Sequence, residues 1–110
     1  MNEPEIIILT PQGRLDADGA RPFQAQLQEH IANGRAHLLV DFSQTRYISS
    51  NGLRVLLVAQ KRAHKNGGAV KLCALSPRLL EIFEMAGFDR VFEIFDTCDD
   101  AKKAMNQFNR

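Results

Sequence analysis

Two adjacent serines, Ser49 and Ser50, stand where the chain passes from an apolar segment into a helical pattern. The stretch at 47–54 reads Tyr-Ile-Ser-Ser-Asn-Gly-Leu-Arg, and helical periodicity follows it. At a helix N-terminus the first backbone N–H groups lack an intrahelical partner and the helix dipole is positive. Such a position stabilises an anion, including a phosphate added to a serine hydroxyl. The pair therefore suits either a phosphorylation site or a helix cap, which is the commoner role of serine there.

A serine hydrolase would need more than these two hydroxyls. Ser50-Asn51-Gly52 matches the second half of a Gly-x-Ser-x-Gly nucleophile elbow, but Ile48 stands where the first glycine belongs. A serine nucleophile also needs an ordered histidine and a carboxylate. The three histidines fall near the ends of predicted elements, and none follows a strand that would bring it to Ser50: His30, His37 and His64. We expect no catalytic residues, metal site or cofactor, because phosphate-binding glycine motifs are also missing from the sequence.

The helix predicted after the serines has two different sides. One side carries residues at intervals of four, three and four: Arg54, Val58, Lys61 and Lys65. The opposite side carries the expected core stripe: Leu53, Leu56, Leu57 and Gln60. The basic side fits either an acidic partner or an ordinary solvated face, and the sequence leaves both interpretations open.

Composition narrows the class of protein. The chain has 110 residues, which predicts one domain over 1–110, and a net charge of +1, which gives no case for binding nucleic acid. No apolar run is long enough to span a membrane, and the N-terminus lacks the basic start of a signal peptide. Cys73 and Cys98 fall in different elements without metal-site spacing. These features predict a reduced, cytoplasmic protein that is not inserted in a membrane.

Hydrophobic periodicity and turn residues divide the chain into strands and helices. Strands are predicted at 5–9, 13–16, 36–41, 69–75 and 91–95. Helices are predicted at 18–33, 51–64, 77–86 and 97–108. Ser76-Pro77 and Thr97 suit the starts of the last two helices, and the apolar side of the third is expected to include Met85. The order predicts an α/β domain with a mixed sheet of about five strands and about four helices.

The chain resembles the STAS domain, and specifically the bacterial anti-sigma factor antagonists, over about Glu5 to Phe108. The motifs that carry the resemblance are Gly13-Arg14-Leu15-Asp16, Leu39-Val40-Asp41-Phe42-Ser43 and Ile48-Ser49-Ser50-Asn51-Gly52-Leu53. The family pattern is often Asp-Ser-Ser/Ala-Gly-Leu, with the first serine phosphorylated. Counting back from Gly52, that serine falls on Ser50, and the family's aspartate falls on Ser49, which makes Ser49 the second choice.

The resemblance implies a function. An anti-sigma factor with a histidine-kinase-like ATPase fold would bind the unmodified protein and phosphorylate Ser50, and a metal-dependent serine phosphatase would reverse the step. The implied contact residues are Asp16, Ser43, Ser49, Ser50, Asn51, Gly52 and Arg54. The pathway's output, whether transcription, secretion or motility, stays open. The alternative is a non-phosphorylated STAS subunit of a membrane transport or lipid-trafficking complex.

Overall fold

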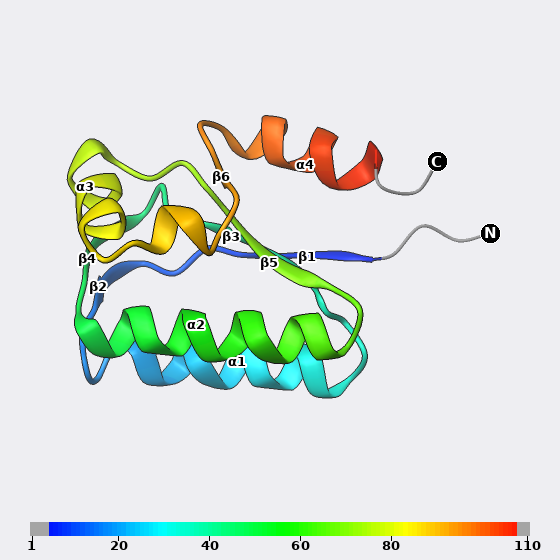
Figure 1. The fold of residues 1–110 in the computed structure, drawn as a ribbon. Helices are drawn as coiled ribbons and strands as arrows, with labels where there is room; N and C mark the ends of the chain where they lie inside the picture. Colours follow the sequence, from blue (N-terminus) through cyan, green and yellow to red (C-terminus); the bar gives the residue numbers. More distant parts are fainter. Residues whose placement is uncertain (1–4, 108–110) are drawn as a thin grey trace.

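The computed structural model describes residues 5–107 and is built around a sheet of four parallel strands. In spatial order these are β1 (Ile6–Leu9), β3 (His37–Asp41), β5 (Ala69–Cys73) and β6 (Ile94–Phe95). Helices α1 (Ala20–Ala32) and α2 (Ser50–Lys65) lie side by side against one face, and α4 (Cys98–Gln107) lies across the other (Figure 1). Parallel strands require such crossover connections.

A second, smaller sheet extends beyond the end of the first. It pairs β2 (Gly13–Leu15) in parallel with β4 (Thr45–Ile48), and Leu15 lies opposite Ile48. The Thr45 Oγ1 hydroxyl donates to the Pro11 carbonyl at 2.7 Å, which joins the two chain segments where the sheets meet. β4 leads directly into α2, so this small sheet sets the position of the serine pair.

The α/β class and the four helices are confirmed, but the strands are arranged differently from the prediction. Sequence patterning predicted no strand at β4, because four residues between two turns are too few for a clear alternation. The predicted strand at 91–95 shortens to Ile94–Phe95, after a 3-10 turn at Phe88–Arg90. Every strand pair among the described residues is parallel, in two sheets rather than one mixed sheet.

The residues that begin and end helix α3 (Pro77–Met85) were predicted correctly from the sequence. The Ser76 hydroxyl accepts from the Leu79 N–H at 3.2 Å, Pro77 opens the helix, and Gly87 follows it with φ of 76°. The expected burial of Met85 was wrong, since its exposed fraction is 84%. Met85 follows the buried Phe83 by two residues, which at about 100° per residue places it on the opposite, solvent-facing side of the helix.

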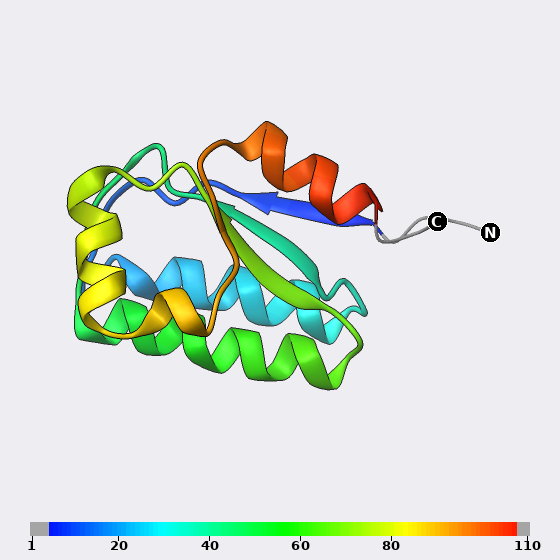
Figure 2. The same cartoon turned by 45° about the horizontal axis from the view of Figure 1, so that its top comes forward.

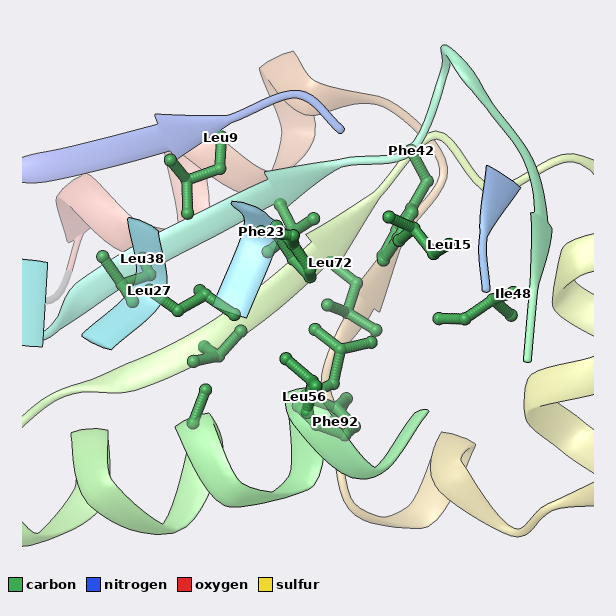
Figure 3. Packing of buried hydrophobic residues seen from close by; sticks show 14 of the residues in the cluster. Leu9, Leu15, Phe23, Leu27, Leu38, Phe42, Ile48, Leu56, Leu72 and Phe92 are labelled. Atoms are coloured by element: carbon green, nitrogen blue, oxygen red, sulfur yellow. The ribbon is translucent and has the colours of Figure 1, made fainter. Parts of the chain in front are cut away.

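The main core fills the space between the sheet and the pair α1 and α2 (Figure 3). Phe23 and Leu27 of α1 and Leu56 of α2 belong to this cluster, together with Leu38 and Leu72 of the central strands. The predicted core stripe of α2 is partly confirmed: Leu56 and Gln60 are buried, whereas Leu53 and Leu57 are half-buried. The positions that complete the buried side are Gly52, Val55, Ala59 and Ala63.

Gln60 is a buried polar residue with a structural role. Its Nε2 donates to the Val91 carbonyl at 3.1 Å, and its Oε1 accepts from the Val70 N–H at 2.7 Å. β6 is too short to pair with the first half of β5, so the Gln60 amide satisfies a strand N–H that the sheet leaves free. The predicted position was correct, and its hydrogen bonds explain why a polar side chain is tolerated there.

The second face of the sheet holds a small cluster of four buried residues: Leu39, Cys73, Ala101 and Met105. Within this layer Cys73 and Cys98 form a disulfide, with their Cα atoms 5.2 Å apart. The prediction that the two cysteines are reduced was therefore wrong, because α4 folds back over β5 and brings together two residues 25 positions apart in the sequence. The Thr97 hydroxyl accepts from the Asp100 N–H at 3.0 Å, as the predicted cap requires, and Phe108 lies outside the described residues.

Candidate functional site

Hydrogen bonds of the Ser49 hydroxyl and backbone N–H fix this residue at the start of α2. Its hydroxyl accepts from the Gly52 N–H at 3.3 Å and donates to the Leu15 carbonyl at 3.0 Å. Its backbone N–H donates to the same Leu15 carbonyl at 3.0 Å. The side chain thus caps the helix and ties it to the end of β2.

Ser50 has a different environment, although it is the next residue. It is the first residue of α2 and its side chain is exposed. Among residues 5–107, no hydrogen bond engages its hydroxyl. The Ser50 hydroxyl is therefore accessible, at the positive end of a 16-residue helix whose first turn contains no acidic residue.

Gly52 allows α2 to approach β2 closely. A Cβ atom at this position would lie 2.7 Å from Ile48 Cγ1 and 2.8 Å from the Leu15 carbonyl oxygen. Both distances are shorter than real Cβ contacts, so any larger residue would push the first turn of α2 away. Because Ser49 and Gly52 are three residues apart, the same helical turn holds both the Ser49 cap and the close contact of Gly52 with β2.

Asp16 lies beside the serine pair, because it follows the residue whose carbonyl binds Ser49. Its Oδ1 accepts from the Gly19 N–H at 2.9 Å, just before α1 begins. This hydrogen bond lowers the pKa of Asp16 from its ordinary value, and the positive charge of Arg14 lowers that pKa further. Arg14 itself stacks over the ring of Tyr47, with its guanidinium carbon 4.4 Å from the ring centroid.

Arg54 extends the site along α2. Its Nη2 donates to the Asn51 Oδ1 at 3.1 Å, and its side chain is exposed. Both residues line a shallow groove of about 300 Å³ between α1 and α2, together with Gln24, Val55 and Val58. Nothing in the sequence singles out Gln24, since an exposed glutamine on a helix gives no signal of its position beside another helix.

Ser43 is the predicted contact residue that the fold separates from the rest. It lies in the turn between β3 and β4, where its N–H donates to the Asp41 carboxylate at 2.9 Å. The four residues of β4 then span about 13 Å before the serine pair. The structure groups the other six at one end of the molecule: Asp16, Ser49, Ser50, Asn51, Gly52 and Arg54.

No histidine lies close enough to act as a base for Ser50. His64 is in the last turn of α2, about 21 Å along the helix. His37 begins β3 and lines, with His64 and Lys71, a cavity of about 280 Å³ at the opposite end of α2. His30 is in the last turn of α1. The arrangement around Ser50 is therefore that of an accessible hydroxyl at a helix N-terminus, without the groups of a catalytic triad.

No helix within residues 5–107 is long and apolar enough to cross a membrane.

Comparison with known proteins identifies the family. The family model described as STAS domain matches residues 2–101. BtrV of Bordetella bronchiseptica, named as a candidate anti-sigma factor antagonist, is 31% identical over 99 residues, covering 90% of this chain and 85% of BtrV.

Solved structures share the fold. A candidate anti-sigma factor antagonist of Thermotoga maritima has a TM-score of 0.86 at 22% identity, covering 91% of this chain and 86% of the other. Bacillus SpoIIAA, an anti-sigma factor antagonist, has been solved in unphosphorylated and phosphorylated forms. Both forms have a TM-score of 0.73 at 19% identity and cover 94% of this chain, and 92% and 94% of SpoIIAA. The chain belongs to the STAS domain family, and its relatives within that family include anti-sigma factor antagonists.

Proposed function

We propose that this protein is an anti-sigma factor antagonist controlled by phosphorylation of Ser50. The unmodified protein binds an anti-sigma factor, itself a serine kinase with a histidine-kinase-like ATPase fold. Phosphorylation of Ser50 dissociates that complex, and a metal-dependent serine phosphatase removes the phosphate so that the complex can form again. The observation that carries the proposal is the exposed Ser50 hydroxyl at the start of α2, in a chain that matches BtrV over 90% of its length.

The hydrogen bonds favour Ser50 over Ser49 as the acceptor. Phosphoryl transfer requires a hydroxyl that the γ-phosphorus of ATP can reach and that can lose its proton to a base on the kinase. The Ser49 hydroxyl is engaged with Leu15 and Gly52, so phosphorylation there would remove its donated hydrogen bond and displace the cap. The Ser50 hydroxyl can react while that cap stays in place.

The position of Ser50 at the start of α2 determines whether a phosphate there would disturb the fold or only the binding surface. A phosphoserine adds a charge of about −1.5 to −2 with strong acceptor oxygens. The free N–H groups of the first turn and the positive helix end stabilise that charge, and the exposed Arg54 lies one turn further along. Phosphorylation should therefore leave the fold intact and change only the surface that the kinase contacts.

The effect on binding comes from charge at this surface. Asp16, beside the serine pair, has a lowered pKa and is negative at neutral pH. A phosphate adds to that charge, and burying both against a partner costs desolvation and repulsion. A loss of about 3 kcal/mol in binding free energy weakens a complex by more than a hundredfold, which is sufficient for a switch. SpoIIAA, with the same fold, has been solved in a phosphorylated form, which supports this picture.

The test compares charge at two exposed positions. Immobilised wild-type protein, Ser50→Ala, Ser50→Asp and the control Asn106→Asp are incubated with lysate of the native host, and captured proteins are identified by mass spectrometry. Asn106 is exposed on α4, across the sheet from α2, so its variant adds a charge of the same sign away from the site. We expect a protein with a histidine-kinase-like ATPase domain on all beads except Ser50→Asp.

Two results would contradict the proposal. Equal capture of that kinase by Ser50→Asp and Asn106→Asp would mean that charge at Ser50 does not control binding. Capture of a transporter or lipid-transfer subunit, equally by wild type and Ser50→Asp, would place the protein in the alternative class of STAS binding subunits and leave Ser50 without a switching role.

A further inference from the structure

We propose that Cys73 and Cys98 form a reversible thiol–disulfide site that fastens α4 to the sheet. The two sulfur atoms are bonded in the structure, one at the end of β5 and the other at the start of α4. The site lies across the sheet from α1 and α2 (Figures 1 and 2). It is therefore a second control point, independent of the proposed phosphorylation of Ser50.

Helix α4 has few other contacts that hold it in place. It has 10 residues, fewer than an isolated helix needs to be stable in water. Of its residues 98–106, whose burial the structure describes, only Ala101 and Met105 are buried, in a cluster of four on which Ile6, Ala74 and Phe95 also pack; among the described residues the main core contains 20 buried residues. Within residues 5–106, no ion pair or side-chain hydrogen bond joins α4 to the sheet. The disulfide is thus the principal attachment of the helix.

The backbone beside Cys73 is strained. Ala74, the next residue, has φ of 61°, the left-handed region that residues other than glycine rarely adopt. Its N–H donates to the Phe95 carbonyl at 3.2 Å, in the short strand that precedes α4. Strain of this kind persists where the surroundings hold the backbone in place, and it is concentrated at functional and switching sites. The disulfide spans this junction, so breaking it loosens the contacts that hold Ala74.

The two sulfurs differ in exposure, and this sets the order of the exchange reaction. Cys73 is fully buried, whereas Cys98 is partly exposed. The thiolate of a cellular dithiol attacks Cys98 Sγ, the bond between the two protein sulfurs breaks, and Cys73 leaves as a thiolate that takes up a proton. The second sulfur of the dithiol then attacks the mixed disulfide and releases Cys98. The protein disulfide gains two electrons and two protons, and the dithiol becomes a disulfide.

Reduction should release α4 and leave the rest of the fold in place. With the covalent link gone, the helix is held by its small apolar cluster alone, and Leu39 becomes accessible as the helix opens. Helix α2 packs on the other face through the main core, so its stability does not depend on this attachment. Reoxidation by a disulfide such as oxidised glutathione closes the site again, because the rest of the fold brings the two cysteines together.

The experiment measures amide hydrogen exchange in the full chain. Protein equilibrated with oxidised glutathione is compared with protein reduced by dithiothreitol under native conditions and with Cys98→Ser, which is tolerable because Cys98 is partly exposed. Alkylation and intact mass count the free thiols in each sample. We expect no free thiol in the oxidised protein and two after reduction. Exchange in 98–107 should rise at least about tenfold in the reduced and Cys98→Ser proteins, with exchange in 50–65 unchanged.

Three outcomes would overturn the proposal. Two free thiols after equilibration with oxidised glutathione would mean that the bond does not form. A disulfide that resists dithiothreitol in the native protein would mean that it is not reversible. Equal exchange in 98–107 across all three samples would mean that the bond does not hold α4. Faster exchange of 50–65 in Cys98→Ser would show that the variant is globally destabilised, and reduced wild-type protein then decides the question alone.

Discussion

The change Gly52→Ala tests whether close packing between α2 and β2 builds the serine site. A new Cβ would lie 2.8 Å from the Leu15 carbonyl oxygen, and an ordinary contact needs at least 3.4 Å. The first turn of α2 must therefore move away from β2. The hydrogen bond from the Gly52 N–H to Ser49 is already 3.3 Å long, so this movement breaks the cap.

Three effects, two destabilising and one stabilising, determine how much Gly52→Ala changes the free energy of unfolding. Overpacking costs about 1–3 kcal/mol, and loss of the cap costs about 1 kcal/mol. Alanine's higher helix propensity returns about 1 kcal/mol. The free energy of unfolding should therefore fall by about 1–3 kcal/mol, measured by urea denaturation. Asn51→Ala, in the same turn without a clash, is the matched control and should change stability by less than about 0.5 kcal/mol. A Gly52→Ala protein as stable as wild type would contradict this prediction, because the gain in helix propensity would then outweigh the clash with β2.

Three further predictions concern the same framework. Ser49→Ala should lower the free energy of unfolding by about 1 kcal/mol, because it removes the cap, whereas Ser50→Ala should change it by less than about 0.5 kcal/mol; urea titration distinguishes them. Gln60→Leu should cost about 2–4 kcal/mol in the same assay, since the Val70 N–H and the Val91 carbonyl lose their partner. Asp16 stabilises the fold above its unfolded pKa of about 3.9, and this contribution is lost as pH falls through the lowered folded pKa. Asp16→Asn should therefore lose less stability than wild type on acidification below about pH 4, and identical acid profiles would contradict this assignment.

Local sequence signals predicted those elements whose ends are set by a few neighbouring residues. Ser76-Pro77 and Gly87 bound α3 because a cap, a fixed φ and a left-handed glycine act within one or two turns. The strand β4 escaped prediction because its pairing with β2 depends on residues about thirty positions earlier. The exposure of Met85 follows from its angular position on α3, on the side opposite the buried Leu79 and Phe83.

In the candidate site, too, some features depend on neighbouring residues and others on residues far away in the sequence. Sequence alone placed two serines at a helix start but left both as candidate acceptors. Which hydroxyl is engaged depends on the Leu15 carbonyl, 34 positions away from Ser49. The disulfide also depends on the folding of α4 over β5, so the spacing of Cys73 and Cys98 gave no sign of it.

Ser50, and not the capping Ser49, is the residue that we propose accepts the phosphate. The most direct measurement incubates wild-type protein, Ser49→Ala and Ser50→Ala with ATP and the kinase identified by capture, and locates the phosphate by fragmentation mass spectrometry. We expect one phosphate on Ser50 in the wild type and in Ser49→Ala, and none in Ser50→Ala. A phosphate on Ser49 in the wild type, or undiminished phosphorylation of Ser50→Ala, would contradict this proposal.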